Sequence, residues 1–310
     1  MSEGPVLVAA GPTASGKSAL AMRLAQSLDG VLICADALQL YRDAPILSAA
    51  PSDGDKARVP HLLYGILSPD ETSSAAHWAS LASSAITAVQ AQGKLPILVG
   101  GTGLYLKALM HGLSPMPDVP ASLRETARAL AAEIGARALH ARLAGRDPVM
   151  AARLRPSDTQ RVTRAWEVLE ATGRSLAEWQ AGAGKPFPAR WFSILLDPPR
   201  TELYEACNAR FLTMVEAGGL EEAQRFIDAP SSLPLLKTLG LKELIRHLKG
   251  EIEREEAITL AQASTRRYAK RQVTWFRHQM RYAAVHQAQF SESFLPEILP
   301  KIRQFLLTAP

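Results

Sequence analysis

Short apolar runs alternate with amphipathic stretches along much of the chain. The runs have the composition of strands that are buried on both faces, and they cover residues 6–10, 31–34, 62–67, 96–99 and 191–196. Apolar residues at helical spacing lie between them, in residues 18–28, 75–90 and 103–111. This alternation predicts an α/β fold with a mostly parallel sheet.

The pattern changes between residues 113 and 188, where helical stretches rich in Arg, Ala and Leu replace it. Segments rich in Pro and Gly, at 113–117 and 182–186, bracket this region. We therefore predict an all-helical domain inserted into the core. The predicted divisions are a first part of the core in 1–112, an inserted Arg-rich domain in 113–190, and a return to the core with basic C-terminal helices in 191–310.

A phosphate-binding pattern, G-x-x-x-x-G-K-[ST], follows the first apolar run, and its residues are Gly11, Pro12, Thr13, Ala14, Ser15, Gly16, Lys17 and Ser18. A strand that breaks into such a loop and then a helix points several backbone N–H groups at one spot. The helix dipole and Lys17 add positive charge there. With a strand before it and a helix after it, a chance Gly-rich turn is a poor explanation. The loop predicts a P-loop NTPase-like core that binds a di- or triphosphate, with Ser18 as a ligand of Mg²⁺.

Two further segments lie where predicted strands end. Asp36 follows the strand at 31–34, and the carboxyl ends of parallel strands meet at one edge of the sheet. Its carboxylate can accept a proton or help to hold a metal, or it can simply cap a following helix. After the strand at 96–99, two glycines allow close approach to a ligand and Thr102 adds a hydroxyl. No Asp ends that strand, which is mild evidence against phosphoryl transfer.

Composition narrows the class of protein. The 310 residues are 47% hydrophobic, which is typical of a globular chain of about two domains. No apolar run approaches the ~20 residues of a membrane span, and we expect no signal peptide. The two cysteines, Cys34 and Cys207, form no metal or disulfide pattern, which suits a reduced cytoplasm. The net charge of +5 and the pI near 9.3 weakly favour an anionic partner.

The distribution of charge is more informative than its total. Residues 257–291 contain no Asp or Glu, and the basic residues there are Arg266, Arg267, Lys270, Arg271, Arg277 and Arg281. On a helical wheel these six fall within an arc of roughly 140°, opposite Thr265, Ala269, Phe276 and Met280. A second cluster, residues 124–174, holds ten arginines, six acids and no lysine. A solvated helix face explains one such cluster equally well. Two of them beside a phosphate loop favour nucleic acid.

Six segments, in order over residues 11–275, resemble those of the bacterial tRNA dimethylallyltransferases. They are 11–18 (G-P-T-A-S-G-K-[ST]), 36–41 (D-[SA]-x-Q-x-Y), 100–105 (G-G-T-x-L-Y), 160–167 (Q-R-x-x-R-A-x-E), 210–220 (R-F-x-x-M, then G-L) and 265–275 (T-R-x-Y-A-K-R-Q-x-T-W). Each segment after the first is weak alone, but six in order are specific. The resemblance therefore covers nearly the whole chain.

The resemblance implies transfer of a dimethylallyl group from dimethylallyl diphosphate to N6 of the adenosine 3′-adjacent to the anticodon of tRNAs, with release of diphosphate. The P-loop then holds the diphosphate and not ATP, with Mg²⁺ on Ser18. The implied catalytic residues are Asp36, Thr102 and Arg210. The implied tRNA-binding residues are Asp36, Ala37, Leu38, Gln39, Thr102, Arg124, Gln160, Arg161, Arg164, Arg266, Lys270 and Arg271. Gln39 would hydrogen-bond the flipped adenine, or merely pack at a turn.

The implied partners are the tRNA anticodon stem-loop and the prenyl donor, for a monomeric cytoplasmic enzyme without membrane contact. Three segments depart from the family pattern: 47–51 (L-S-A-A-P for G-T-A-K-P), 61–65 (H-L-L-Y-G for a double His with L-I-D) and 240–243 (G-L-K-E for G-Y-K-E). Contacts that the family makes through the missing Lys, His and Asp are not expected here. The alternatives are a prenyltransferase for free adenine nucleotides, a small-molecule P-loop kinase and a non-catalytic RNA-binding protein.

Overall fold

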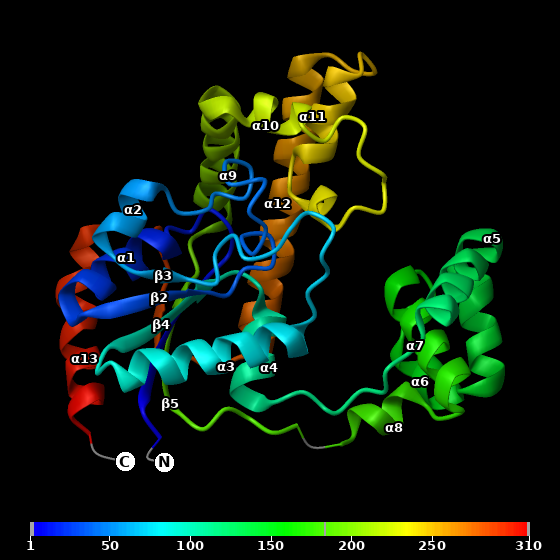
Figure 1. Cartoon of the computed structure of the whole chain (residues 1–310), viewed down its shortest axis with the longest axis horizontal. Coiled ribbons are helices and arrows are strands. Elements are labelled where there is room, and N and C mark those ends of the chain that lie inside the picture. Colours follow the sequence, from blue (N-terminus) through cyan, green and yellow to red (C-terminus); the bar gives the residue numbers. More distant parts are fainter. Residues whose placement is uncertain (1–2, 183, 309–310) are drawn as a thin grey trace. The chain divides into compact units, whose positions relative to one another are not determined.

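A computed structural model describes residues 3–182 and 184–308. Ala183, in the second of the two predicted bracketing segments, lies outside the described residues. The chain forms two compact units (Figure 1). The core unit runs up to Met110 and resumes at Phe187, and the helical unit is His111–Pro186. Within the described residues, no helix is both long and apolar enough to cross a membrane.

The core unit contains a six-stranded sheet in the order β3-β2-β4-β1-β5-β6, and every neighbouring pair is parallel. Its strands are β1 (Pro5–Ala10), β2 (Gly30–Cys34), β3 (His61–Leu62), β4 (Leu95–Gly100), β5 (Arg190–Leu196) and β6 (Ala284–His286). The parallel sheet confirms the predicted fold class. In this order β4 lies between β2 and β1, so the loops that follow these three strands are neighbours at one edge.

Two strands differ from the sequence prediction. The predicted strand at 62–67 was wrong over most of its length, because Leu63 (φ 65°) and Gly65 (φ 63°) take left-handed backbone conformations that end β3 at Leu62. Beyond this break only an isolated bridge joins Leu67 to Tyr41. Strand β6 was not predicted, since its three residues form no apolar run.

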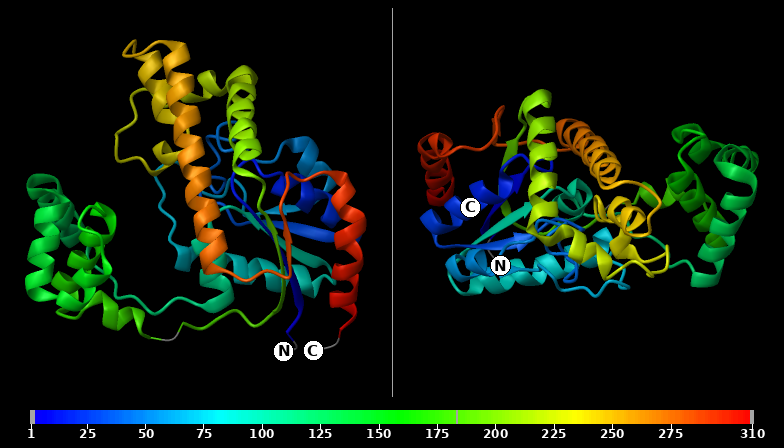
Figure 2. Two further views of the ribbon diagram at one scale, coloured as in Figure 1. Left: turned by 180° about the vertical axis from the view of Figure 1, so that it is seen from behind. Right: turned by 90° about the horizontal axis from the view of Figure 1, so that it is seen from above.

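Helices cover both faces of the sheet (Figures 1 and 2). The core helices are α1 (Lys17–Leu28), α2 (Asp53–Arg58), α3 (Ala75–Ala91), α4 (Gly103–His111), α9 (Arg200–Met214), α10 (Leu220–Gln224), α11 (Leu241–Leu248), α12 (Arg254–Gln279) and α13 (Leu295–Leu307). Alternate strand residues face opposite sides, so Leu7 packs with α1 and α13, whereas Val8 packs with α3, α4 and α12. A π-helical turn, Val215–Gly219, joins α9 to α10. Single 3₁₀ turns lie at Pro234–Lys237 and Glu292–Phe294.

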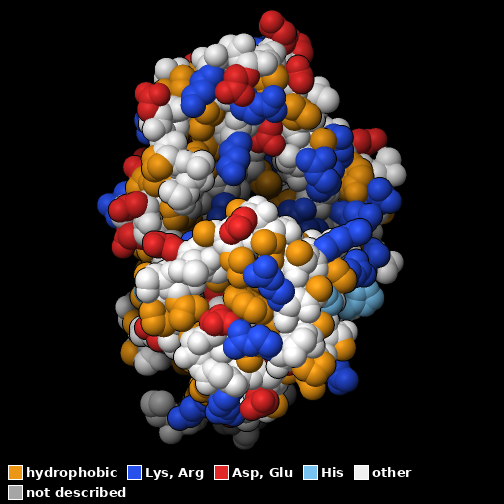
Figure 3. Space-filling model, turned by 90° about the vertical axis from the view of Figure 1, so that its right-hand side faces the viewer, with side chains coloured by type: hydrophobic (Ala, Val, Ile, Leu, Met, Phe, Trp, Pro, Cys, Tyr) orange, Lys and Arg blue, Asp and Glu red, His pale blue; other side chains and the backbone are white. Residues whose placement is uncertain are grey.

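The helical unit has a hydrophobic core of its own. Its helices are α5 (Ala121–Arg146), α6 (Pro148–Arg153), α7 (Thr159–Thr172) and α8 (Leu176–Gln180). Leu139, Leu143 and Val162 are fully buried in this core, and Gly135 (φ 81°) kinks α5. In the space-filling view of Figure 3, basic side chains stand among hydrophobic and acidic ones. The unit runs from residue 111 to residue 186, whereas the predicted insertion runs from 113 to 190, so the two ranges differ by two residues at the start and four at the end.

Candidate active site

The phosphate loop has the backbone of an anion cradle. Ala14 (φ 63°) and Gly16 (φ 86°) both take left-handed conformations, and α1 begins at Lys17. A side chain at position 16 would also meet the Cβ of Phe290 at 2.8 Å, so this position needs glycine. The N–H groups of the first turn of α1 have no acceptor within the helix. They are therefore available to an anionic ligand.

Two cations lie at this loop. Lys17 is only 8% exposed, and its Nζ donates to the carbonyl of Pro12 at 3.3 Å. Burial lowers the pKa of Lys17 to about 8; the carboxylate of Asp36 opposes this shift and the guanidinium of Arg210 adds to it. Arg210, on α9, donates from Nη2 to Oγ1 of Thr13. Two desolvated cations beside free N–H groups form a site for a multiply charged anion.

Asp36 stands beside this cationic loop without being fixed at both oxygens. Its Oδ1 accepts from the N–H of Leu38 at 3.1 Å, which closes a turn. No helix follows, so the alternative that Asp36 caps one was wrong. Its Oδ2 faces the loop after β4, 3.5 Å from where a Cβ on Gly101 would lie. One carboxylate oxygen is therefore held by the fold, and the other has no hydrogen-bond partner among the described residues.

The loop after β4 packs tightly against the Asp36 segment. A Cβ on Gly100 would lie 2.0 Å from the carbonyl oxygen of Ala35, so only glycine fits there. Thr102 binds this segment twice, from its N–H to the Ala35 oxygen (3.2 Å) and through Oγ1, which accepts from the N–H of Ala37 (2.9 Å). Tyr268 of α12 lies next to Thr102, and burial raises the pKa of Tyr268. Because Oγ1 of Thr102 accepts from the N–H of Ala37, the Thr102 side chain helps to hold the Asp36 segment in place.

Gln39 is already committed to the fold through its amide nitrogen. Its Nε2 donates to the carbonyl oxygens of Ser48 (3.0 Å) and Ala49 (2.7 Å), which uses both protons. Only Oε1 is left to meet another group. Contact between Gln39 and a base, through that oxygen, stays a prediction.

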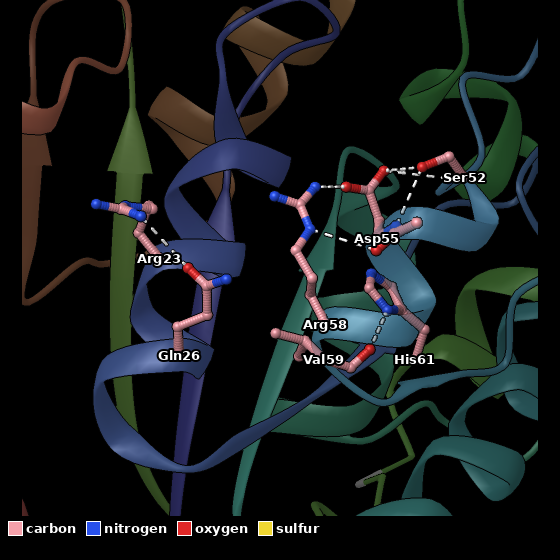
Figure 4. A network of polar contacts seen from close by, with 8 residues as sticks. Arg23, Gln26, Ser52, Asp55, Arg58, Val59 and His61 are labelled. Carbon is pink, nitrogen blue, oxygen red and sulfur yellow. Dashed lines mark hydrogen bonds and ion pairs between the residues drawn. The ribbon is translucent and has the colours of Figure 1, made fainter.

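Ser18 opens onto a cavity of about 260 Å³. Gln39, Asp55, His61 and Tyr64 also line it, and so do Ala49, Ala50 and Pro51. Two of these lining residues are held by polar contacts that Figure 4 shows. Asp55 accepts from Ser52 Oγ (2.7 Å) and pairs with Arg58, and His61 Nδ1 lies 2.7 Å from the Val59 oxygen. The two departing segments at 47–51 and 61–65 thus both contribute to the wall of this cavity.

A Mg²⁺ ion fits the Ser18 end of this cavity by its chemistry. No cluster of three or more His, Cys, Asp or Glu side chains that could cage a metal exists in the part of the chain that is described. Mg²⁺ needs no such cage, because it commonly keeps several waters and binds through a few protein oxygens together with substrate phosphates. The hydroxyl of Ser18, at the start of α1, offers such an oxygen beside the anion cradle.

The basic face of α12 is only partly free. As predicted, Thr265, Ala269 and Phe276 are buried on the opposite face. Arg277, however, forms a bidentate pair with Asp197 at 2.8 and 3.1 Å. Arg281 lies beyond the end of α12 and is not part of its face. A helical wheel contains neither the distant partner of Arg277 nor the residue at which the helix ends.

The predicted RNA contacts on α12 also include one residue that is bound within the fold and two that are exposed. Arg266 donates from Nη1 to Oδ1 of Asn208 at 2.6 Å, so this group is already bound within the fold. Lys270 is exposed and lines a second cavity, of about 190 Å³, with Arg200. Arg271 is exposed, with its guanidinium 5.5 Å from the ring centre of Tyr268. Lys270 and Arg271 are the groups best placed to meet an anion in solution.

In the helical unit, Gln160 and Arg164 of α7 line a cavity of about 490 Å³ together with Arg128 of α5. Arg164 pairs with the buried Glu167 at 3.1 Å. Two predicted RNA contacts do not line this cavity. Arg161 pairs with Asp158 at 3.5 Å, and Arg124 binds the Val119 oxygen (2.8 Å) and Asp118 (3.1 Å).

The sequence-based site omitted Gln272, which is central to the observed one. This α12 residue is 5% exposed, and its amide bonds both the phosphate loop and the loop after β4. The only signal in the sequence was its place in the segment 265–275. A glutamine on a helix gives no indication of which distant loops it joins.

Comparison with known proteins gives a consistent result. The model of the family described as IPP transferase matches residues 39–279. A tRNA dimethylallyltransferase of Paramagnetospirillum magneticum is 52% identical over 309 residues, covering 99% of this chain and 98% of that protein. The crystal structure of a tRNA isopentenylpyrophosphate transferase from Bacillus halodurans superposes with a TM-score of 0.70 at 33% identity, covering 98% of this chain and 97% of the other. A eukaryotic dimethylallyltransferase acting on tRNA shares the fold, with a TM-score of 0.79 at 24% identity, covering 99% and 80% of the two chains.

Proposed function

The chain belongs to the IPP transferase family, and from that premise we propose that it transfers a dimethylallyl group from dimethylallyl diphosphate to N6 of the adenosine 3′-adjacent to the anticodon of tRNA. The observation that carries this proposal is the meeting of three loops at one sheet edge. They bring a cationic phosphate cradle beside a carboxylate that has one oxygen free. A leaving diphosphate needs the cationic cradle, and an amine nucleophile needs the carboxylate as an acceptor for its proton.

The cradle acts on the leaving group. When the allylic C–O bond breaks, the bonding electrons stay on the diphosphate oxygen, and negative charge grows there. Lys17, Arg210 and the N–H groups of the loop then stabilise this charge in a poorly solvated place. Such preorganised donors are worth most at the atom where charge develops.

Asp36 acts on the acceptor. The N6 nitrogen forms its bond to the allylic carbon, and the proton that it loses passes to the free Oδ2 of Asp36. Thr102 keeps the Asp36 segment in place through the bond from Ala37. The adenine must leave its stack to reach this edge, which costs a few kcal/mol.

Ser18 would hold a Mg²⁺ ion together with the donor phosphates, and the ion would neutralise part of the charge on the diphosphate. Basic groups on both units would bind the RNA backbone: Lys270 and Arg271 in the core unit, and Arg128 and Arg164 in the helical unit. We further propose that the enzyme works in the cytoplasm as a monomer.

Incubation with radiolabelled dimethylallyl diphosphate, Mg²⁺ and either tRNA or adenosine monophosphate tests the proposal. Label should enter tRNA and not the free nucleotide, and inorganic pyrophosphate should compete with the donor. Transfer to adenosine monophosphate would indicate the nucleotide prenyltransferase. ATP hydrolysis stimulated by a small metabolite would indicate a kinase. Binding of tRNA without transfer would indicate a non-catalytic RNA-binding protein.

A further inference from the structure

One buried side chain joins the two halves of the proposed site. Oε1 of Gln272 accepts from the N–H of Thr13 at 2.7 Å, and its Nε2 donates to the carbonyl of Gly101 at 2.8 Å. The partners lie 259 and 171 residues away in the chain. Thr13 belongs to the phosphate loop and Gly101 to the loop that carries Thr102. No other side chain among the described residues hydrogen-bonds both loops.

The position requires a side chain that accepts and donates at once. An amide offers an acceptor to Thr13 and a donor to Gly101 from one planar group at any pH, whereas a carboxyl of the same size does so only when it is protonated. A carboxylate would repel the carbonyl of Gly101, and an apolar side chain would leave both backbone groups unpaired in a buried place. A Cβ on Gly101 would come within 2.1 Å of Nε2, so the loop and the amide are in close contact.

The bonds continue on both sides of Gln272. Toward the donor side, Thr13 also accepts from Arg210 through its hydroxyl. Toward the acceptor side, Gly101 leads to Thr102, whose Oγ1 accepts from Ala37, the neighbour of Asp36. An uninterrupted path of bonds and backbone thus runs from the phosphate cradle through Gln272 to the carboxylate.

We propose that Gln272 is a positioning residue that fixes the spacing between the phosphate loop and the Thr102–Asp36 loops, and so sets the approach of N6 to the allylic carbon. The inference rests on the proposed function. Gln272 touches neither substrate in this role. Its effect is on geometry, where a misplacement of ~1 Å can cost about 10²-fold in rate.

The first test replaces Gln272 by a side chain of similar shape without hydrogen bonds. Gln272→Met should lower the single-turnover rate of transfer by about 10²-fold, while the Kd values of donor and tRNA stay within a few-fold. Gln262→Met is the matched control, because Gln262 lies on the same helix and bonds the Asn208 oxygen at 3.2 Å, away from both loops. It should leave the rate within about twofold. Equal rates for the two variants would overturn the inference, and so would weaker donor binding with unchanged rate.

A second variant adds a signature that loss of packing does not produce. In Gln272→Glu the ionised carboxylate cannot donate to Gly101, whereas its protonated form can. Burial beside a carbonyl raises the pKa of that carboxyl. The ratio of variant to wild-type rate should therefore increase as the pH falls through this pKa. A ratio independent of pH would contradict the inference even if Gln272→Met fails to fold. Absence of transfer by the wild type would instead overturn the proposed function.

Discussion

The cations at the sheet edge and those of the helical unit are held in different ways. Lys17 is buried, and Arg210 is bonded to Thr13 in the loop that it serves. In the helical unit Arg128 is exposed at a cavity rim, and Arg174 pairs with an exposed Glu178 one turn away. Buried cations carry a desolvation cost that an anion at a fixed point relieves. Exposed cations carry little desolvation cost, and those without a partner, such as Arg128, can bind any phosphate backbone with strong salt dependence.

Helix α12 carries a cation that is paired within the fold and one that is not, and sequence spacing does not separate them. Arg277 and Lys270 both belong to the predicted basic face. Arg277 holds Asp197, which is 8% exposed, whereas Lys270 faces solvent. The comparison indicates that a cation contributes to chemistry, to the fold or to RNA affinity according to what is buried next to it. Each prediction below tests one of these assignments.

Among the cations, the largest effect is expected at the phosphate loop. Lys17→Ala removes a cation from the place where leaving-group charge grows, so transfer should fall by about 10²–10³, or roughly 2.7–4 kcal/mol of barrier. Affinity for tRNA should change little, because Lys17 is buried. The measurements are single-turnover transfer and filter binding of tRNA. Loss of tRNA binding in parallel with transfer would remove the distinction between buried and exposed cations.

Arg277→Ala should act on stability. It leaves the carboxylate of Asp197 without its partner, which for a fully buried pair costs about 3–5 kcal/mol. Because Arg277 is half exposed, we expect about 1–3 kcal/mol. Lys270→Ala, which lies seven residues away on the same face, is the control and should leave thermal unfolding unchanged. If Arg277→Ala has the same Tm as the wild type, Arg277 does not stabilise the fold and is simply a solvated surface residue.

Donor binding should depend on pH through Lys17. Its pKa is about 8 without ligand, chiefly because of burial, and a bound diphosphate favours the ammonium form and raises that pKa. Below pH 8 the group is charged in both states and affinity is constant. Above pH 8 binding must take up a proton, so Kd should rise by up to about tenfold per pH unit. Calorimetric titration checks this, and Lys17→Arg, which stays charged, should remove the dependence.

The smallest effect is expected in the helical unit. Arg128→Ala should make the slope of log affinity for tRNA against log salt shallower by about 0.7–0.9, as for one lost phosphate contact. Turnover at saturating tRNA should not change. Arg174→Ala is the matched control, since that arginine is paired with Glu178 and lies over Trp179. Equal slopes for both variants would mean that the cavity beside Arg128 does not meet the RNA backbone.

Local pattern was sufficient for most of the sheet, for the loop at 11–18 and for the place of Asp36 at a strand end. The local pattern gave wrong strand predictions where the backbone conformation or the strand pairing is not determined by the residue types. Leu63 is an ordinary apolar residue in sequence, yet its positive φ ends β3. Strand β6 exists because it pairs with β5, and its own residues do not require it.

The site shows the same limit. Asp36 and Lys17 both belong to local motifs that follow predicted parallel strands, so their closeness at one edge of the sheet could be predicted. The roles of Gln272, Arg277 and Gln39 depend on partners that lie far away or on a loop whose path composition does not specify. Such contacts are set by tertiary packing and not by spacing along a helix.

The most direct test of the division between chemistry and RNA affinity is Asp36→Asn. Asparagine keeps an acceptor for the N–H of Leu38, so the turn survives, but an amide cannot take up the N6 proton. Single-turnover transfer should fall by about 10²–10⁴, or roughly 3–5 kcal/mol of barrier, while tRNA and donor affinities stay within a few-fold. Near-normal turnover, or loss of Mg²⁺-dependent donor binding in place of turnover, would contradict the account.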